Sequence, residues 1–216
     1  TPIMVGYVFR YDECFMEIKK IIKSKNLGKL VEVDSYCGSW LPSWRKGIDY
    51  KNSVSARKNL GGGVLLELSH DLDLVNTLVG PIKIKYVSNI NTNLLEIDVE
   101  DLAMIYATSK KCNSIIIRLN FCTKPEKRYL KFRYSKEELS WDILKRVIKI
   151  NYANKRDEVL YQSNFDAEHK YEEQLRNFFA FASKEQDTLC SLEDGIKNLN
   201  LISSAQKFKD NNYEKN

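Results

Sequence analysis

The hydrophobic pattern at the beginning of the chain predicts three elements. Residues 2–10 are rich in β-forming side chains, which is typical of a strand. Apolar residues then recur at helical spacing from 12 to 25, and Asp12 is placed to cap this helix. Residues 30–38 alternate between apolar and polar side chains, which predicts a second strand with one buried face.

A long irregular stretch follows at residues 39–60 and contains Trp40 and Trp44. A loop of this length in a compact domain is usually functional or disordered, and two tryptophans argue against disorder. It either packs down on its own aromatic side chains or forms part of a site. Gly61-Gly62-Gly63 then begins a helix that runs to about Val79, where Gly80-Pro81 ends it.

The middle of the chain is β-rich. Its clearest strand alternates Ile115, Ile117 and Leu119 with polar residues, and short links such as 109–112 predict antiparallel neighbours. The strands expected in this part are 82–90, 99–108, 113–122, 127–134 and 139–150.

Two helices are expected at the end of the chain. Residues 165–184 carry an apolar stripe, and Ser191 begins a last helix with Asp194 at the capping-box position. Residues 210–216 are expected to fray. A run of strands with helices segregated before and after it predicts an α+β fold, in which helices pack on one face of the sheet.

Composition narrows the class of protein. The 216 residues are 43% hydrophobic and 29% charged, which is enough for a packed core, and we expect one domain over residues 1–216. No apolar run reaches the ~18 residues of a membrane helix, and no basic-then-apolar leader is present. The net charge of +5 is scattered among acids, which does not favour a nucleic-acid binder.

Cysteine and histidine usage indicates a reduced, cytoplasmic protein without a metal site. The five cysteines are odd in number and no pair has the C-x-x-C spacing. There are only two histidines, His70 and His169, which is a poor basis for a zinc site.

The triple glycine has two open explanations. It does not match G-x-G-x-x-G or a P-loop, so a dinucleotide fingerprint is absent. The glycines either let the helix start approach another backbone closely, or leave free N–H groups that hold an anion.

Glu67 and His70 are the candidate chemical pair on the predicted helix. Their spacing of three residues, and the spacing of four between Glu67 and Asp71, place these side chains on one face of a continuous helix. A carboxylate beside an imidazole can orient it for proton transfer. Such a pair also occurs as an ordinary surface or core hydrogen bond.

Several motifs in this order resemble the C-terminal half of the glucose-fructose oxidoreductase / inositol dehydrogenase / rhizopine catabolism (Gfo/Idh/MocA) family. They are Val5-Gly-Tyr-Val-Phe-Arg10, Gly28-Lys-Leu-Val31, the run from Asn59 to Asp73, Tyr171 to Phe179, and Ser191-Leu-Glu-Asp-Gly195. The resemblance covers essentially the whole chain to about Phe208.

The resemblance implies a two-domain enzyme of which this chain is the second part. That part is an α+β domain with an open mixed, largely antiparallel sheet and helices on one face, and it provides substrate binding and oligomerisation. The N-terminal Rossmann domain that binds NAD or NADP is absent from the sequence. So is the Glu-Lys-Pro motif that carries the family's catalytic lysine.

The catalytic residues implied by the resemblance are His70 and Glu67. The family has an acid after the glycines and a histidine four residues later, whereas His70 follows Glu67 by three, a one-residue contraction. Arg10, Trp44, Arg45 and Tyr50 are assigned to the substrate site by location alone.

The sequence therefore predicts a substrate-binding and oligomerisation domain from an NAD(P)-dependent oxidoreductase acting on a sugar, nucleotide-activated sugar or cyclitol. The isolated chain is expected to be inactive and to bind no cofactor. Because Leu102, Met104 and Tyr106 make the second side of strand 99–108 apolar, we expect a homodimer or higher homo-oligomer formed through the sheet face. The alternative is a non-catalytic dimerisation or sugar-sensing module. Neither nucleic acid nor membrane is an expected partner.

Overall fold

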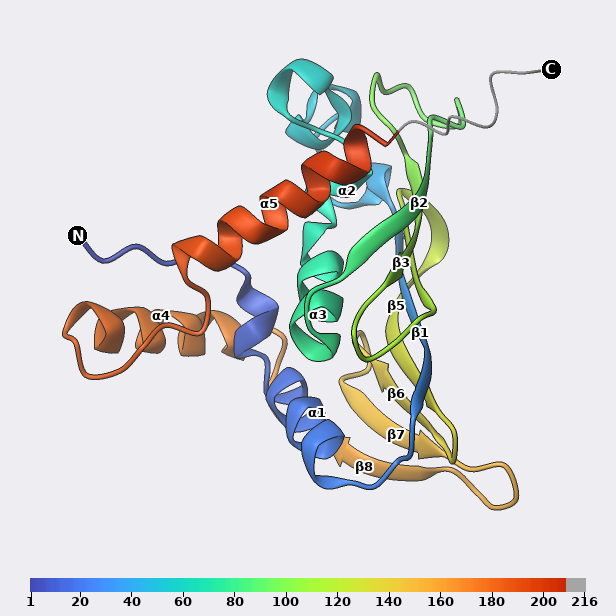
Figure 1. Ribbon diagram of the computed structural model, residues 1–216. Helices are drawn as coiled ribbons and strands as arrows, with labels where there is room; N and C mark the ends of the chain where they lie inside the picture. Colours follow the sequence, from blue (N-terminus) through green and yellow to red (C-terminus); the bar gives the residue numbers. More distant parts are fainter. Residues whose placement is uncertain (209–216) are drawn as a thin grey trace.

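A computed structural model describes residues 1–208; the tail expected to fray, residues 210–216, lies outside this range. Eight strands form one sheet in the order β2-β3-β4-β1-β5-β6-β7-β8 (Figure 1). β1 and β4 run parallel, and the other neighbouring pairs run antiparallel, so the sheet is mixed and open. The strands are β1 (Leu30–Trp40), β2 (Lys83–Ile90), β3 (Leu102–Thr108), β4 (Ile115–Asn120), β5 (Cys122–Tyr134), β6 (Glu138–Asp142), β7 (Val147–Asn151) and β8 (Glu158–Gln162).

The helices lie on one side of this sheet (Figure 1), which confirms the predicted α+β class. They are α1 (Glu13–Ser24), α2 (Val64–Glu67), α3 (Ser69–Val79), α4 (His169–Ala182) and α5 (Leu192–Gln206). The predicted caps are confirmed: Asp12 accepts a hydrogen bond from the Cys14 N–H, and Ser191 and Asp194 form a reciprocal capping box. Within residues 1–208, no helix has the length and apolar character needed to cross a membrane.

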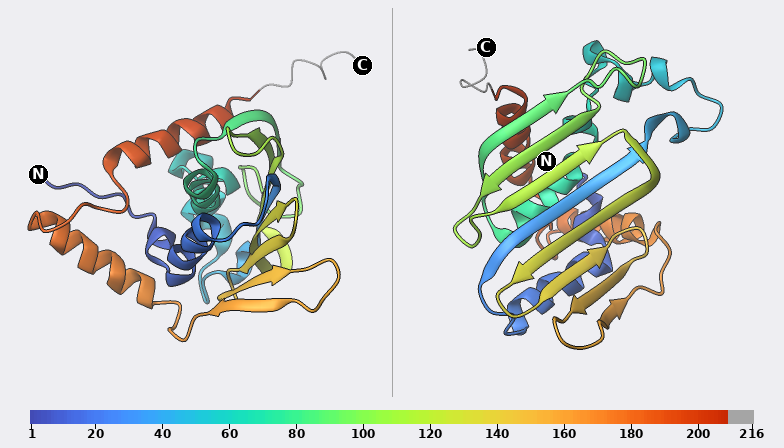
Figure 2. Two further views of the ribbon diagram at one scale, coloured as in Figure 1. Left: turned by 60° about the horizontal axis from the view of Figure 1, so that its bottom comes forward. Right: turned by 90° about the vertical axis from the view of Figure 1, so that its right-hand side faces the viewer.

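The core lies between the sheet and the helices. Side chains of β4 alternate as predicted, with Ile115, Ile117 and Leu119 fully buried. The opposite face of the sheet is not crossed by any helix of the described chain (Figure 2). Met104 and Tyr106 of β3 point to this open face and are 39% and 38% exposed.

The predicted strand at residues 2–10 is not present. The segment is irregular to Tyr7 and then forms a short 3-10 helix, η1 (Val8–Tyr11). A strand needs a neighbour for its backbone N–H and C=O groups, and this segment is not part of the eight-stranded sheet. Within the described residues, its backbone makes one hydrogen bond to the backbone of the end of the chain, from the Val5 N–H to the Cys190 carbonyl.

Two further predictions in the β region need correction. The strand predicted at 139–150 is a hairpin of β6 and β7, and Arg146 in its turn has a φ of 56°. The buried side chains occupy odd-numbered positions in β6, such as Trp141, and even-numbered positions in β7, such as Ile148. This change in the alternation indicates the turn between the two strands. β8 was not predicted, because it is a short edge strand with little buried side-chain surface.

Candidate active site

The glycine turn builds a tightly packed helix start. A Cβ on Gly62 would lie 2.3 Å from the Val54 carbonyl oxygen, and a Cβ on Gly63 would lie 2.5 Å from a Glu100 carboxylate oxygen. The same carboxylate accepts a hydrogen bond from the Leu65 N–H at 3.3 Å. The chain therefore places its own carboxylate where an anion would bind, and close packing explains Gly62 and Gly63.

The helix predicted from the glycines to Val79 is interrupted. Leu68, with φ −100° and ψ 22°, leaves helical geometry and separates α2 from α3. Glu67 ends the first helix and His70 lies in the first turn of the second. The continuous helix that would align these two side chains on one face is therefore not formed.

His70 faces the N-terminal segment. Its ring packs edge-on against Tyr7 and Phe9, with centroid distances of 5.4 Å and 5.6 Å. Its Nδ1 atom is buried and has no hydrogen-bond partner among the described residues. Burial, helped by the charge of Arg128, lowers the pKa of His70 to about 4. The imidazole is therefore neutral near pH 7, and it is a weaker base than a free histidine.

The nearest charged structure around His70 is an ion pair between Asp71 and Arg128. Two nitrogens of Arg128 donate to the two oxygens of Asp71 at 2.7 Å and 3.3 Å, and Asp71 is completely buried. The guanidinium carbon of Arg128 also lies 4.1 Å from the centroid of the Phe9 ring. Sequence analysis missed Arg128, although the alternation of β5 places it on the same face as Leu130 and Phe132.

A buried lysine also lies against Phe9. Lys170, in the first turn of α4, is 8% exposed, and its Nζ atom is 5.2 Å from the Phe9 centroid. Nζ donates to the Ala167 carbonyl. Burial lowers the pKa of this ammonium, while the charge of Asp12 opposes the change. Nothing in the local sequence distinguishes Lys170 from the other lysines of the chain.

Arg10 joins three segments in the interior. Its guanidinium binds Asp73 at 2.6 Å and 2.9 Å, Asp194 at 2.9 Å, and the Leu189 carbonyl at 2.9 Å. Asn198 donates to the same Asp73 carboxylate at 3.0 Å. These contacts tie η1 to α3 and α5, so the geometry gives Arg10 a structural role. Its assignment to the substrate site stays a prediction.

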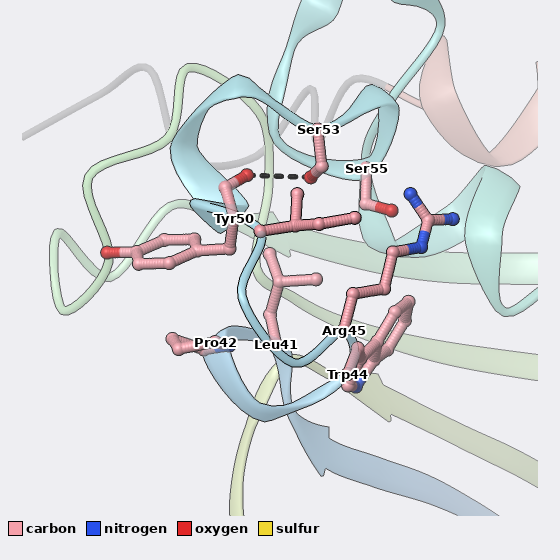
Figure 3. A pocket seen from close by; sticks show the side chains of 8 residues that line it. Leu41, Pro42, Trp44, Arg45, Tyr50, Ser53 and Ser55 are labelled. Carbon is pink, nitrogen blue, oxygen red and sulfur yellow. Dashed lines mark hydrogen bonds between the residues drawn. The ribbon is translucent and has the colours of Figure 1, made fainter.

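Trp44, Arg45 and Tyr50 come together around a small pocket of the irregular loop (Figure 3), and their assignment to the substrate site stays a prediction. Leu41, Pro42, Ile48, Ser53 and Ser55 complete its lining. The indole N–H of Trp44 donates to Ser39 at 2.8 Å, and the Tyr50 hydroxyl accepts from the Glu96 N–H at 3.3 Å.

Glu67 contacts the lining of this pocket, although it is not itself one of the lining residues. The hydroxyl of Ser55, one of the lining residues, donates to Glu67 at 2.9 Å. His70 is not among the residues that line the pocket. The structure thus divides the predicted site into a loop pocket with Glu67 and a cluster of His70, Tyr7, Phe9 and Arg128.

Metal and thiol chemistry find no support in the described part of the chain. Residues 1–208 contain no group of three or more His, Cys, Asp or Glu side chains placed to hold a metal ion. The five cysteines are free thiols, and burial raises the pKa of Cys14 to about 12 and that of Cys122 to about 11. These values disfavour a reactive thiolate.

Comparison with known proteins identifies one family. Residues 15–137, more than half of the chain, match the sequence model of the GFO/IDH/MocA C-terminal domain. No curated protein sequence matches the chain.

Solved structures show the same fold at low sequence identity. An inositol dehydrogenase homolog of Azotobacter vinelandii, complexed with NAD+, is similar with a TM-score of 0.76 at 13% identity, over 94% of this chain and 62% of that one. UDP-N-acetylglucosamine 3-dehydrogenase GnnA of Acidithiobacillus ferrooxidans is similar with a TM-score of 0.68 at 15% identity, over 93% and 58%. A super-repressor mutant of Gal80p of Saccharomyces cerevisiae is similar with a TM-score of 0.78 at 13% identity, over 94% and 62%. The chain therefore spans about three fifths of the length of these structures.

Proposed function

The chain belongs to the Gfo/Idh/MocA family through its C-terminal domain, and from this premise we propose that it is the substrate-binding and oligomerisation domain of an NAD(P)-dependent oxidoreductase. The substrate class is a sugar, a nucleotide-activated sugar or a cyclitol. The similar structures of an inositol dehydrogenase homolog and a UDP-N-acetylglucosamine dehydrogenase support this class.

The observation that carries the proposal is the state of His70. It lies seven residues after Gly63 within the matched domain, and its buried Nδ1 atom has no hydrogen-bond partner in the described part of the chain. A neutral imidazole beside a bound sugar would take the proton of a hydroxyl group as that group is oxidised, and return it in the reverse direction. Tyr7 and Phe9 restrict the ring and exclude water from one side of it.

The residues of this chain do not fit a dinucleotide cofactor. The N–H groups of Gly61, Gly62 and Gly63 donate to carbonyls of Lys58, Arg57 and Ser55. The Glu100 carboxylate lies at the start of α2, where it would repel a pyrophosphate. We therefore assign NAD or NADP to another domain of the full-length enzyme.

The helices and the sheet both leave apolar surface for partners. Leu175 and Phe179 of α4 are 57% and 65% exposed, and Ile196 of α5 is 50% exposed. A further domain of the same enzyme would cover such a surface. We assign the homodimer contact to the open face of the sheet, where Met104 and Tyr106 are exposed.

The test is His70→Ala in a full-length enzyme that contains this domain, assayed by nicotinamide absorbance with sugars, sugar nucleotides and cyclitols. We expect kcat to fall by roughly 10²–10⁴, the usual contribution of a general acid–base group. His169→Ala is the matched control, because the second histidine of the chain lies on α4 and stacks on Phe165. A loss below about tenfold in His70→Ala would remove His70 from the chemistry.

A non-catalytic dimerisation or sugar-sensing module is the second candidate. The interrupted helix between Glu67 and His70 favours it, because an acid–imidazole pair is not assembled. The similarity in fold to a super-repressor mutant of Gal80p supports this second candidate. A glycine fingerprint and a Glu-Lys-Pro motif encoded before residue 1 would decide for the enzyme.

A further inference from the structure

Arg128 occupies an unusual place on β5. Its neighbours on the inner side of the strand, Leu130 and Phe132, are completely buried among apolar side chains. Arg128 stands at the same face, opposite Cys37 of β1. A cation at such a position needs partners, and it finds them on two other segments of the chain.

The two partners of Arg128 are the two neighbours of His70. Asp71, which follows His70 on α3, receives two hydrogen bonds from the guanidinium. Phe9, whose ring edge meets the imidazole at an interplanar angle of 70°, lies beneath the guanidinium. One planar cation thus connects the helix that carries His70 with the segment that packs against its ring.

We propose that Arg128 is a positioning residue that holds the His70 imidazole in place, through Asp71 on one side and the Phe9 ring on the other. The inference rests on the proposed function only for the role of His70 in proton transfer. The contacts themselves are properties of this domain.

The charges around His70 agree with this arrangement. The titratable groups that face it are Tyr7 from the N-terminal segment, Asp71 from α3, Arg128 from β5 and Lys170 from α4. Burial lowers the pKa of His70 most, Arg128 and Lys170 lower it further, and Asp71 opposes them. An imidazole released from this contact would return toward its ordinary pKa of 6.5.

Lysine cannot replace Arg128 in this role. Two donors in a fixed fork bind the carboxylate, and the flat guanidinium stacks on the Phe9 ring; a lysine ammonium offers neither. Arg128→Lys therefore keeps the charge but loses the geometry. In Arg128→Met/Asp71→Asn both charges are removed together, so no unpaired buried charge is left to unfold the domain.

The experiment is NMR on the 216-residue chain, whose only histidines are His70 and His169. The titration midpoint of His70 and the nuclear Overhauser contacts between its ring and Phe9 are measured in the wild type and both variants. We expect the contacts to weaken and the midpoint to rise from about 4 toward 6.5. Arg133→Met is the matched control: Arg133 lies on the same strand but pairs with Glu32 and Glu138. It should leave His70 unchanged.

The outcomes separate this inference from the proposed function. Unchanged contacts between His70 and Phe9 in both variants overturn the positioning role, even if the midpoint moves, because charge alone would then explain the shift. Turnover that survives His70→Ala in a full-length enzyme overturns the proposed function and leaves the NMR result intact. If Arg128→Lys does not fold, the double variant alone decides.

Discussion

Glu67 and His70 are three residues apart in the sequence but act in different surroundings. Glu67 accepts a hydrogen bond from Ser55 in the irregular loop, and His70 packs against Tyr7 and Phe9. The change of backbone geometry at Leu68 separates them. Proton transfer by His70 would therefore not depend on a carboxylate from the preceding turn, and its surroundings keep it neutral instead.

The depressed pKa of His70 predicts a specific pH dependence of stability. Its folded-state pKa of about 4 lies below the ordinary value of 6.5, so the unfolded chain binds the proton more readily. The stabilising contribution is complete above pH 6.5 and is lost as the pH falls toward 4. The difference between the two pKa values corresponds to a decrease of up to about 3 kcal/mol in the free energy of unfolding.

The measurement compares urea denaturation of the wild type and His70→Phe at several pH values between 4 and 7. The variant should lack the His70 part of the slope, so the difference between the two free energies of unfolding should change with pH. A pH-independent difference for His70→Phe would show that the folded protein does not resist protonation at this site.

Arg10 is expected to be a major contributor to stability. Arg10→Met would leave the buried Asp73 carboxylate, whose pKa is already raised by burial, without its cation. Removal of one partner of a buried ion pair costs about 3–5 kcal/mol. Lys20→Met, which removes a lysine 71% exposed from its pair with Glu17, should cost less than about 0.5 kcal/mol. Equal effects of the two variants on the urea midpoint would contradict the structural role of Arg10.

Substitutions in the glycine turn can test whether close packing or backbone conformation is the stronger reason for glycine at these positions. Gly62→Ala would force a Cβ against the carbonyl oxygens of Val54 and Ser55, at 2.3 Å and 2.7 Å. Because backbone atoms cannot rotate away, we expect a loss of about 3 kcal/mol or more. The adjacent Gly61 has a φ of 81° and open space around it, so Gly61→Ala should cost only about 1 kcal/mol. Thermal unfolding of the two variants decides; a larger loss at Gly61 would refute the packing explanation.

The spacing of apolar residues in the sequence predicts those helices and strands whose buried side chains lie on one face of a single segment. The spacing of Phe15, Ile18 and Ile21 predicted α1, and these side chains are buried. The segment 2–10 has the composition of a strand but no neighbouring strand, and only tertiary structure can reveal that. Strand propensity is a property of one segment, whereas a strand forms only when a second segment pairs with it.

The candidate site was predictable in part for the same reason. Trp44, Arg45 and Tyr50 lie on one loop, so their proximity followed from the sequence. The contact between Asp71 and Arg128 joins residues 57 positions apart, and no local pattern reports such a distance. The break between α2 and α3 at Leu68 was not predictable from the sequence either, because no glycine or proline stands at this position.

The last prediction concerns assembly through the open face of the sheet. Met104 and Tyr106 are exposed on β3, and Tyr36 of β1 stacks on Tyr129 of β5 with a centroid distance of 5.6 Å. These side chains surround the ion pair of Arg118 and Asp34 on the same face. An exposed sheet face with such apolar and aromatic side chains usually marks an interface. A two-fold axis would pair the patch with itself, which is the commonest arrangement of homo-oligomers.

Light scattering behind a sizing column should therefore report about twice the chain mass of 25.2 kDa, or a higher multiple of it. Met104→Glu would place a charge in the centre of the contact and should produce monomers, because an unpaired buried charge is costly. Leu94→Glu is the matched control: Leu94 is 61% exposed on a loop outside the sheet, and its substitution should leave the assembly intact. A wild-type monomer at tens of micromolar would assign the apolar face to another domain, and monomers from both variants would show that charge alone disperses the protein.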